Sequence, residues 1–145
     1  MELSVVASRW QEAVGGVYEA SAWVAAETAC PASADLTLTA ISAALRATVD
    51  AATRERQLAL LRAHPALAGK AARASSLTHE STAEQARAGL GALTQDELDR
   101  FNALNGAYRD KFGFPFILAV RNITKRAILA AFEARLTNTA AAEEA

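Results

Sequence analysis

The residue best suited to acid–base chemistry in this sequence is His64, which lies in the segment Arg-Ala-His-Pro-Ala-Leu-Ala-Gly-Lys over 62–70. The ring of Pro65 disfavours α geometry at the residue before it, so His64 should close the helix that precedes it. The carbonyl end of a helix favours the charged imidazole, and both charge states are accessible near pH 7. His64 is therefore a candidate proton donor, although a His-Pro pair alone is more often a helix boundary than an active site.

A second polar group consists of Ser81, Glu84 and Gln85, at the spacing i, i+3 and i+4. This spacing puts the three side chains on one face of the first turn of a helix. A serine with a glutamate three residues later is also a capping box, in which both side chains bond only to backbone donors. A cap leaves Gln85 without a role, which slightly favours a binding site. Both interpretations stay open on these residues alone.

The stretch from Gly113 to Val120 is apolar and should lie outside a helix, because Gly113 ends the preceding helix and Pro115 prevents its continuation. Backbone groups that leave a helix but remain near the core need partners, and the side chains over 116–120 provide none. A ligand carboxylate or oxyanion would accept those N–H groups, and a neighbouring helix N-terminus would add positive potential. Core packing, with the backbone satisfied by another loop, is the competing interpretation.

Length and composition favour one all-helical domain. The chain has 145 residues, of which 52% are hydrophobic and only seven are Gly and three Pro. This length is enough to bury a core without disulfides or a metal. Alanine, the best helix former, dominates the apolar residues. We expect an all-α, single-domain helical bundle over residues 1–139, followed by a tail over 140–145.

Charge and cysteine usage limit the partners and the compartment. Fifteen Lys and Arg against sixteen Asp and Glu give a formal net charge of -1, so the overall field gives no reason to expect nucleic acid or an anionic membrane as a partner. Cys30 is the only cysteine, which excludes an internal disulfide and fits a reducing compartment. No stretch is typical of a signal peptide or of a membrane span. We therefore expect a cytoplasmic protein.

A metal centre is not expected. His64, His79, Cys30 and Glu84 lack the short paired spacings of a zinc site. The interval between the two histidines also spans a predicted loop, so the sequence predicts no metal ligands.

The helical spacing of apolar residues predicts the elements that position these segments. Helices are expected over residues 36–49, 53–64, 81–93, 94–111 and 122–136, with a loop over 31–35. Four side chains should cap helix starts: Ser21, Thr53 and the pair Thr94 and Glu97, which has the spacing of a capping box.

Three motifs occur in the order and spacing of one enzyme family. They are His-Pro-x-Leu-Ala-Gly-Lys at 64–70, Ser-Thr-Ala-Glu-Gln at 81–85, and Leu-Asn-x-Ala-Tyr-x-x-Lys-Phe-Gly-Phe-Pro-Phe-Ile at 104–117. Together with Glu-x-Ser-x-Trp-Val at 19–24, they make the chain resemble the 2-oxo-4-hydroxy-4-carboxy-5-ureidoimidazoline (OHCU) decarboxylases of urate degradation. The likeness covers nearly the whole chain, and the Phe-Gly-Phe-Pro-Phe motif is highly specific.

The resemblance implies an all-helical, cofactor-free enzyme, commonly a homodimer, that converts OHCU into (S)-allantoin. By motif, His64 is the implied catalytic acid and Pro65 lies beside the substrate. Ser81, Glu84 and Gln85 are implied to bind its polar groups, and we expect Glu84 to orient the imidazole or the substrate. The implied backbone contacts come from Phe116, Ile117, Leu118, Ala119 and Val120.

Two departures and two rival functions accompany this resemblance. The family usually has Asp where this chain has Ala66, and its members usually continue beyond Ala145 with a helix whose arginine lies near the site. Arg121 is the nearest substitute in sequence, without support from the motif. The rivals are an acid–base enzyme for a related ureido or imidazole compound, and a binding module that only captures a ligand or partner.

Overall fold

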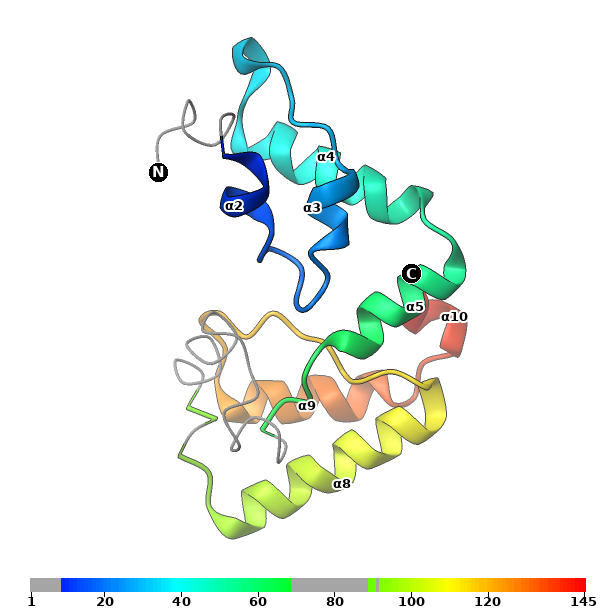
Figure 1. Ribbon diagram of the computed structural model, residues 1–145. Helices are drawn as coiled ribbons and strands as arrows, with labels where there is room; N and C mark the ends of the chain where they lie inside the picture. The colour runs from blue at the N-terminus through cyan, green and yellow to red at the C-terminus, as the bar shows by residue number, and fades with distance from the viewer. Residues whose placement is uncertain (1–8, 69–88, 91) are drawn as a thin grey trace. The chain divides into compact units, whose positions relative to one another are not determined.

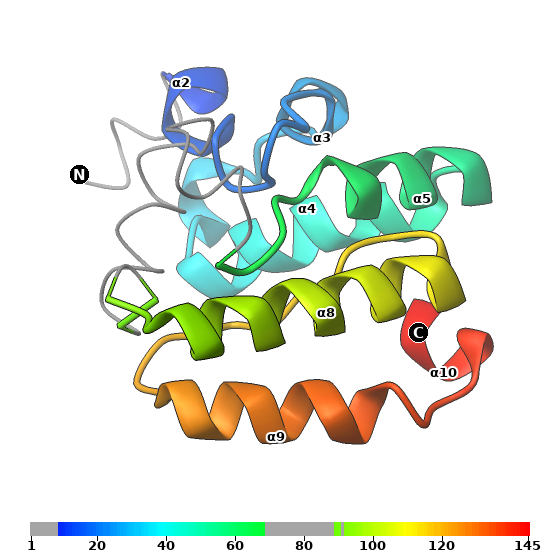
Figure 2. The ribbon, with the colours of Figure 1, turned by 90° about the horizontal axis from the view of Figure 1, so that it is seen from below.

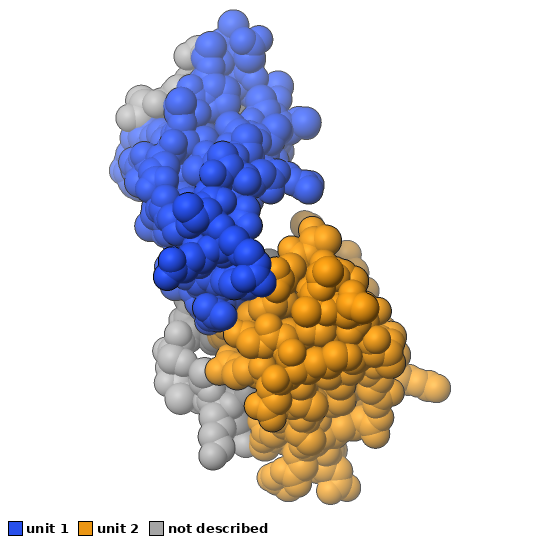
Figure 3. Space-filling model, turned by 90° about the vertical axis from the view of Figure 1, so that its right-hand side faces the viewer, with its two compact units in different colours: residues 1–63 blue, residues 64–145 orange. Residues whose placement is uncertain are grey.

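The structure is a computed structural model that describes residues 9–68, 89–90 and 92–145 (Figures 1 and 2). Every regular element in these residues is a helix, which confirms the predicted all-α class. No helix in these ranges is both long enough and apolar enough to cross a membrane. The chain divides into two compact units, residues 1–63 and residues 64–145, drawn in blue and orange in Figure 3.

Unit 1 contains a series of short and medium helices. They are α2 (Trp10–Val14), α3 (Trp23–Glu27), the 3-10 helix η1 (Ser33–Asp35), α4 (Leu38–Ala51) and α5 (Arg54–Ala63). Helix α4 begins and ends two residues later than predicted. Thr37 takes the capping position and accepts a hydrogen bond from the Ala40 N–H at 3.0 Å, which fixes the start of the helix.

The two caps predicted in unit 1 have different outcomes. The cap at Thr53 is confirmed, because its hydroxyl accepts a hydrogen bond from the Arg56 N–H at 3.3 Å. The cap at Ser21 is wrong: Ala22, already in α geometry, precedes α3, and no side chain caps this helix. The Ser21 carbonyl instead accepts a hydrogen bond from the Val24 N–H at 3.1 Å. The main chain thus supplies the acceptor that the hydroxyl was expected to supply.

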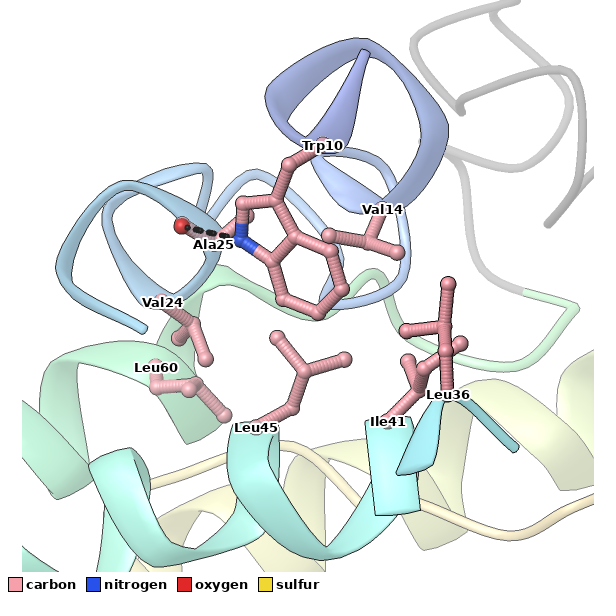
Figure 4. Packing of buried hydrophobic residues seen from close by; sticks show 8 residues of the cluster. All are labelled: Trp10, Val14, Val24, Ala25, Leu36, Ile41, Leu45 and Leu60. Carbon is pink, nitrogen blue, oxygen red and sulfur yellow. Dashed lines mark hydrogen bonds between the residues drawn. The ribbon is translucent and has the colours of Figure 1, made fainter. Parts of the chain in front are cut away.

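The core of unit 1 is built around Trp10, whose ring lies between α2 and α4 above Leu45 (Figure 4). The indole N–H donates to the Ala25 carbonyl at 3.1 Å, so the large ring is buried without leaving its polar atom unpaired. The rest of the cluster is apolar: Val14, Val24, Ala25, Leu36, Ile41, Leu45 and Leu60.

Unit 2 contains the helices α8 (Gln95–Phe112), α9 (Lys125–Arg135) and α10 (Ala140–Glu144). The predicted capping box of α8 is confirmed: the Glu97 N–H donates to Thr94 Oγ1 at 3.2 Å, and the Thr94 N–H donates to Glu97 Oε2 at 2.9 Å. Gly113 ends α8 as predicted, in the left-handed region at a φ of 77°.

Helix α9 begins at Lys125, three residues later than predicted. Asn122 has a φ of 60°, a left-handed conformation that forms a turn and cannot continue a helix. Thr124 then caps α9 by accepting a hydrogen bond from the Ala127 N–H at 3.2 Å. The segment expected as a C-terminal tail contains α10, capped in the same way by Thr139.

Helices α8 and α9 lie side by side and run in the same direction (Figures 1 and 2). The chain must therefore return along the pair between Phe112 and Lys125. With 18 residues, α8 is about 27 Å long, and only an extended segment, at roughly 3.3 Å per residue, covers that distance in so few residues. The geometry of the two helices thus requires the non-helical run over 115–120.

Aromatic side chains hold this return segment against the helices. The Phe116 ring stacks on the Phe132 ring of α9, with centroids 3.8 Å apart and planes at 13°. Its other neighbour is the Tyr108 ring of α8, edge-on at 5.3 Å. All three residues are at most 1% exposed. The return segment is therefore anchored in the core of unit 2 by Phe116.

Candidate functional site

The structure places His64 directly after the last residue of α5, Ala63, as the proline rule predicts. His64 and Pro65 are both half-buried. They lead into a turn at Leu67 and Ala68, which are buried. Ala68 has a φ of 54°, a left-handed conformation that is unfavourable for a residue with a Cβ atom. We call residues 64–68 the His64 turn.

Asn105 of α8 holds the His64 turn in place. Its Nδ2 donates to the Leu67 carbonyl at 2.8 Å. Its Oδ1 is buried and has no hydrogen-bond partner within the described residues. A buried acceptor left unpaired costs about 1–3 kcal/mol, so such an atom calls for a ligand or water donor. The turn that carries His64 is therefore held by one end of an amide whose other end has no partner among the described residues.

The second part of the site is the return segment, residues 116–120. The structure confirms that it lies outside a helix. Phe116 and Val120 are buried, Ile117 and Leu118 are half-buried, and Ala119 is exposed. Within the described parts of the chain, none of the five N–H groups donates to an acceptor. Among the described residues, this agrees with the interpretation in which a ligand accepts these N–H groups, and no other loop is seen to do so.

Arg135, the last residue of α9, binds the return segment and the aromatic ring that anchors it. Its Nη1 donates to the Ile117 carbonyl at 2.7 Å, and its guanidinium carbon lies 4.6 Å from the centre of the Phe116 ring. Its Nη2 donates to Glu143 of α10 at 2.6 Å. One guanidinium group therefore ties together the return segment, α9 and α10.

Glu143 is the counter-charge of this arginine and is only 3% exposed. Burial alone would raise the pKa of its carboxyl group, but hydrogen bonds from Arg135, Tyr108 and Asn138 outweigh it and lower the pKa to about 2. Burial and the hydrogen bond to Glu143 raise the pKa of the Tyr108 hydroxyl to about 12. Near neutral pH, the carboxylate is thus charged and the phenol is protonated, as their hydrogen bond requires.

One face of α8 supports both parts of the site. Asn105 and Tyr108 are three residues apart, so they are neighbours on the helix surface. The first holds the His64 turn, and the second contacts Phe116 and Glu143. The periodicity of the sequence indicates that both residues lie on one buried face of this helix, but it does not show which segments they contact. A further signal is that both belong to the long motif over 104–117.

Three of the predicted site residues, Ser81, Glu84 and Gln85, lie outside the described residues, and so does His79. Arg121, the substitute considered for the family's arginine, is exposed. Among residues 9–68, 89–90 and 92–145, no group of three His, Cys, Asp or Glu side chains could hold a metal ion.

The described groups suit a small, polar, anionic ligand. A half-buried imidazole can transfer a proton, and free backbone N–H groups can bind oxygen atoms that carry negative charge. Groups of these two kinds are what an acid–base site with an oxyanion-binding wall requires.

The comparisons with known proteins agree on one family. A family model described as OHCU decarboxylase matches residues 4–145. The 2-oxo-4-hydroxy-4-carboxy-5-ureidoimidazoline decarboxylase of Halalkalicoccus jeotgali is 42% identical over 93% of this chain and 74% of its own length. The uric acid degradation bifunctional protein PucL of Bacillus subtilis is 41% identical over 86% of this chain, which corresponds to 24% of that longer protein.

A solved structure gives the same result at the level of the fold. The crystal structure of an (S)-allantoin synthase superposes with a TM-score of 0.72 at 39% sequence identity. The match covers 98% of this chain and 45% of the other. The all-helical architecture is thus the one found in that allantoin synthase.

The bond from Asn105 to the His64 turn can be tested by Asn105→Asp. The change keeps the shape of the side chain but replaces the donor to the Leu67 carbonyl with a charged acceptor. We expect the free energy of unfolding at pH 7 to fall by about 1–3 kcal/mol. The loss should shrink as the pH falls, because a protonated carboxyl group can again donate to the carbonyl. Denaturant titration at several pH values measures both effects.

The matched control is Asn102→Asp, an exposed position on the same helix. This change should alter the free energy of unfolding by less than about 0.5 kcal/mol. Equal losses for the two variants would show that the bond to Leu67 does not hold the turn.

Proposed function

Because this chain belongs to the OHCU decarboxylase family, we propose that it is a carboxy-lyase that converts OHCU into (S)-allantoin in urate degradation. The extent of the family match and the level of identity to named decarboxylases support this function. The observation in the structure that supports it most is the half-buried His64, held directly after α5 in a turn that Asn105 anchors.

The chemistry requires no cofactor. The carboxylate of the substrate sits on a carbon next to an imine carbon, so the electron pair of the breaking C–C bond moves into the C=N bond as carbon dioxide leaves. The electron-rich intermediate then takes up one proton at carbon on one face, while the hydroxyl group becomes the carbonyl and its proton moves to the ring nitrogen that received the electron pair. The protein has to orient the carboxylate, stabilise the developing negative charge and deliver that proton.

We assign the proton to His64 and the charge stabilisation to the return segment. The imidazolium donates its proton and recovers one from solvent after each turnover. The free N–H groups of Ile117, Leu118, Ala119 and Val120 bind substrate oxygens, with Phe116 anchoring the segment. Preorganised donors of this kind act without reorganisation at the moment of reaction.

The remaining roles rest on motif alone. Pro65 borders the substrate, Ser81, Glu84 and Gln85 bind its polar groups, and Glu84 also orients the imidazole or the substrate. Ala66 stands where the family usually has Asp, so in this chain the His64 turn lacks any help from that carboxylate. The hydrogen bond from Asn105 therefore holds the His64 turn in the absence of that carboxylate.

We also propose that the enzyme is a cytoplasmic homodimer, on the basis of the family resemblance and the single cysteine. Sedimentation equilibrium should give twice the chain mass of 15.3 kDa. A mass of one chain at micromolar concentration would contradict the dimer.

The proposed function is tested with OHCU generated in place from urate by urate oxidase and hydroxyisourate hydrolase. Circular dichroism follows optically active allantoin, which an enzyme should produce faster than the uncatalysed decay. His64→Asn should lower kcat by about 10²- to 10⁴-fold, the usual contribution of a general acid, while the far-ultraviolet spectrum stays unchanged.

Arg46→Ala is the control, because that side chain is 78% exposed on α4 and has no role in the site. It should retain full activity. A folded His64→Asn variant that still forms (S)-allantoin at the normal rate would refute the role of His64. A wild-type chain without effect on OHCU would favour a related substrate or a binding module.

A further inference from the structure

We infer that Arg135 is a positioning residue for the decarboxylation: by binding the Ile117 carbonyl, it fixes the direction and the strength of the Leu118 N–H donor. This role rests on the proposed function, since it concerns the same wall of the same site. No motif in the sequence points to Arg135, and its partners lie on other elements.

The direction of the Leu118 N–H follows from the planarity of the peptide bond. The Ile117 carbonyl and the Leu118 N–H belong to one peptide unit, and in a trans peptide they point in opposite directions. The described residues contain no cis peptide bond. Arg135 Nη1 holds the carbonyl oxygen at 2.7 Å, so the Leu118 N–H must point away from the guanidinium. Rotating this N–H away would break the bond to Arg135.

The charge of Arg135 also strengthens this donor. A hydrogen bond from a charged group is shorter and roughly twice as strong as one between neutral groups. Binding at the carbonyl polarises the peptide unit and makes its N–H a better donor, because hydrogen bonds in a chain reinforce one another. The effect is largest away from water, and Leu118 is half-buried. A substrate oxygen that gains negative charge would benefit most.

Arg135 can act as a fixed anchor because several groups hold its guanidinium in place. Its Nε and Nη2 donate to Glu143 Oε2 at 2.9 and 2.6 Å, and its Nη2 donates to the Tyr108 hydroxyl at 3.3 Å. The Phe116 ring lies beside the guanidinium plane. A lysine offers a single ammonium group and cannot make these contacts together.

A hydrogen bond that only joined two helices would not need to bind a peptide unit of the return segment. Elsewhere in unit 2, Lys111 Nζ donates to the Leu136 carbonyl at 2.5 Å, which also joins a cation to a backbone oxygen. That bond joins the end of α8 to the end of α9 and lies outside the return segment. The two cations thus differ in the peptide unit that each one polarises, which makes Lys111 a suitable control.

The test compares Arg135→Met, Arg135→Lys and Lys111→Met in the coupled allantoin assay, with kcat and KM measured separately. We expect Arg135→Met to lower kcat by about 10- to 100-fold with KM changed less than about threefold, because the donor acts mainly on the transition state. Arg135→Lys should recover only part of kcat. Lys111→Met should keep the wild-type values.

Amide NMR supplies a readout that does not depend on turnover. In the ¹⁵N-labelled protein, the Leu118 amide proton should shift upfield in Arg135→Met, because its peptide unit is no longer polarised. The same resonance should stay in place in Lys111→Met. If Arg135→Met does not fold, Arg135→Lys carries both measurements, with a smaller shift and a smaller loss of kcat.

Either of two results would overturn the positioning role while the proposed function stands: an unchanged kcat in folded Arg135→Met, or a Leu118 resonance that does not respond. An effect of the same size in Lys111→Met would show a general loss of stability and would overturn it too. A wild-type chain that produces no optically active allantoin would overturn the proposed function, and this role with it.

Discussion

The hydrogen bond between Arg135 and the Ile117 carbonyl stabilises the return segment, in which the chain of unit 2 lacks the backbone hydrogen bonds of a helix. Parallel α8 and α9 force the chain to return along them in an extended form (Figure 2), and Phe116 of this run packs against Tyr108 and Phe132. A helix satisfies its own backbone groups, whereas an extended run beside no strand satisfies none. One carbonyl of this run is bound by a half-buried arginine, whose charge Glu143 balances. The N–H groups of this run have no acceptor among the described residues, and donors of this kind suit an anionic ligand.

The His64 turn is a second, shorter non-helical stretch whose backbone is held by a side-chain hydrogen bond. A helix end followed by proline leaves a short non-helical stretch, and Ala68 adopts a left-handed conformation within it. Strained backbone persists only where the surroundings hold it, and such positions cluster at functional sites. Asn105 supplies that support through the Leu67 carbonyl. Because Tyr108 lies one turn further along the same face of α8, a single helix face supports both non-helical stretches.

Local signals in the sequence predicted most of the fold. The capping box at Thr94, the stop at Gly113 and the boundary at His64 depend on neighbouring residues, and the structure confirms all three. The cap predicted at Ser21 was wrong because the backbone carbonyl of this residue, and not its hydroxyl, accepts the hydrogen bond from Val24. The start of α9 was placed too early because a left-handed Asn122 is not visible in apolar periodicity.

The site was harder to predict because its support is nonlocal. Arg135 meets Ile117 across 18 residues and Tyr108 across 27, and only the packing of α8 against α9 brings them together. Its signal, a basic residue in the last turn of a helix, is also what any helix end shows. The non-helical course of the return segment was predictable from Gly113 and Pro115, whereas the sequence left open whether a ligand or another loop accepts its N–H groups. The roles of Ser81, Glu84 and Gln85 remain predictions from motif.

A crystal structure of the chain with (S)-allantoin bound would examine the imidazole and the return segment together. We predict that the His64 imidazole contacts the ligand, and that the Leu118 nitrogen lies about 2.9 Å from one of its oxygen atoms, the usual length of an N–H···O bond. Arg135 should keep its bond to the Ile117 carbonyl in that complex. A ligand seated away from His64, or a Leu118 N–H directed at a protein acceptor, would contradict this arrangement.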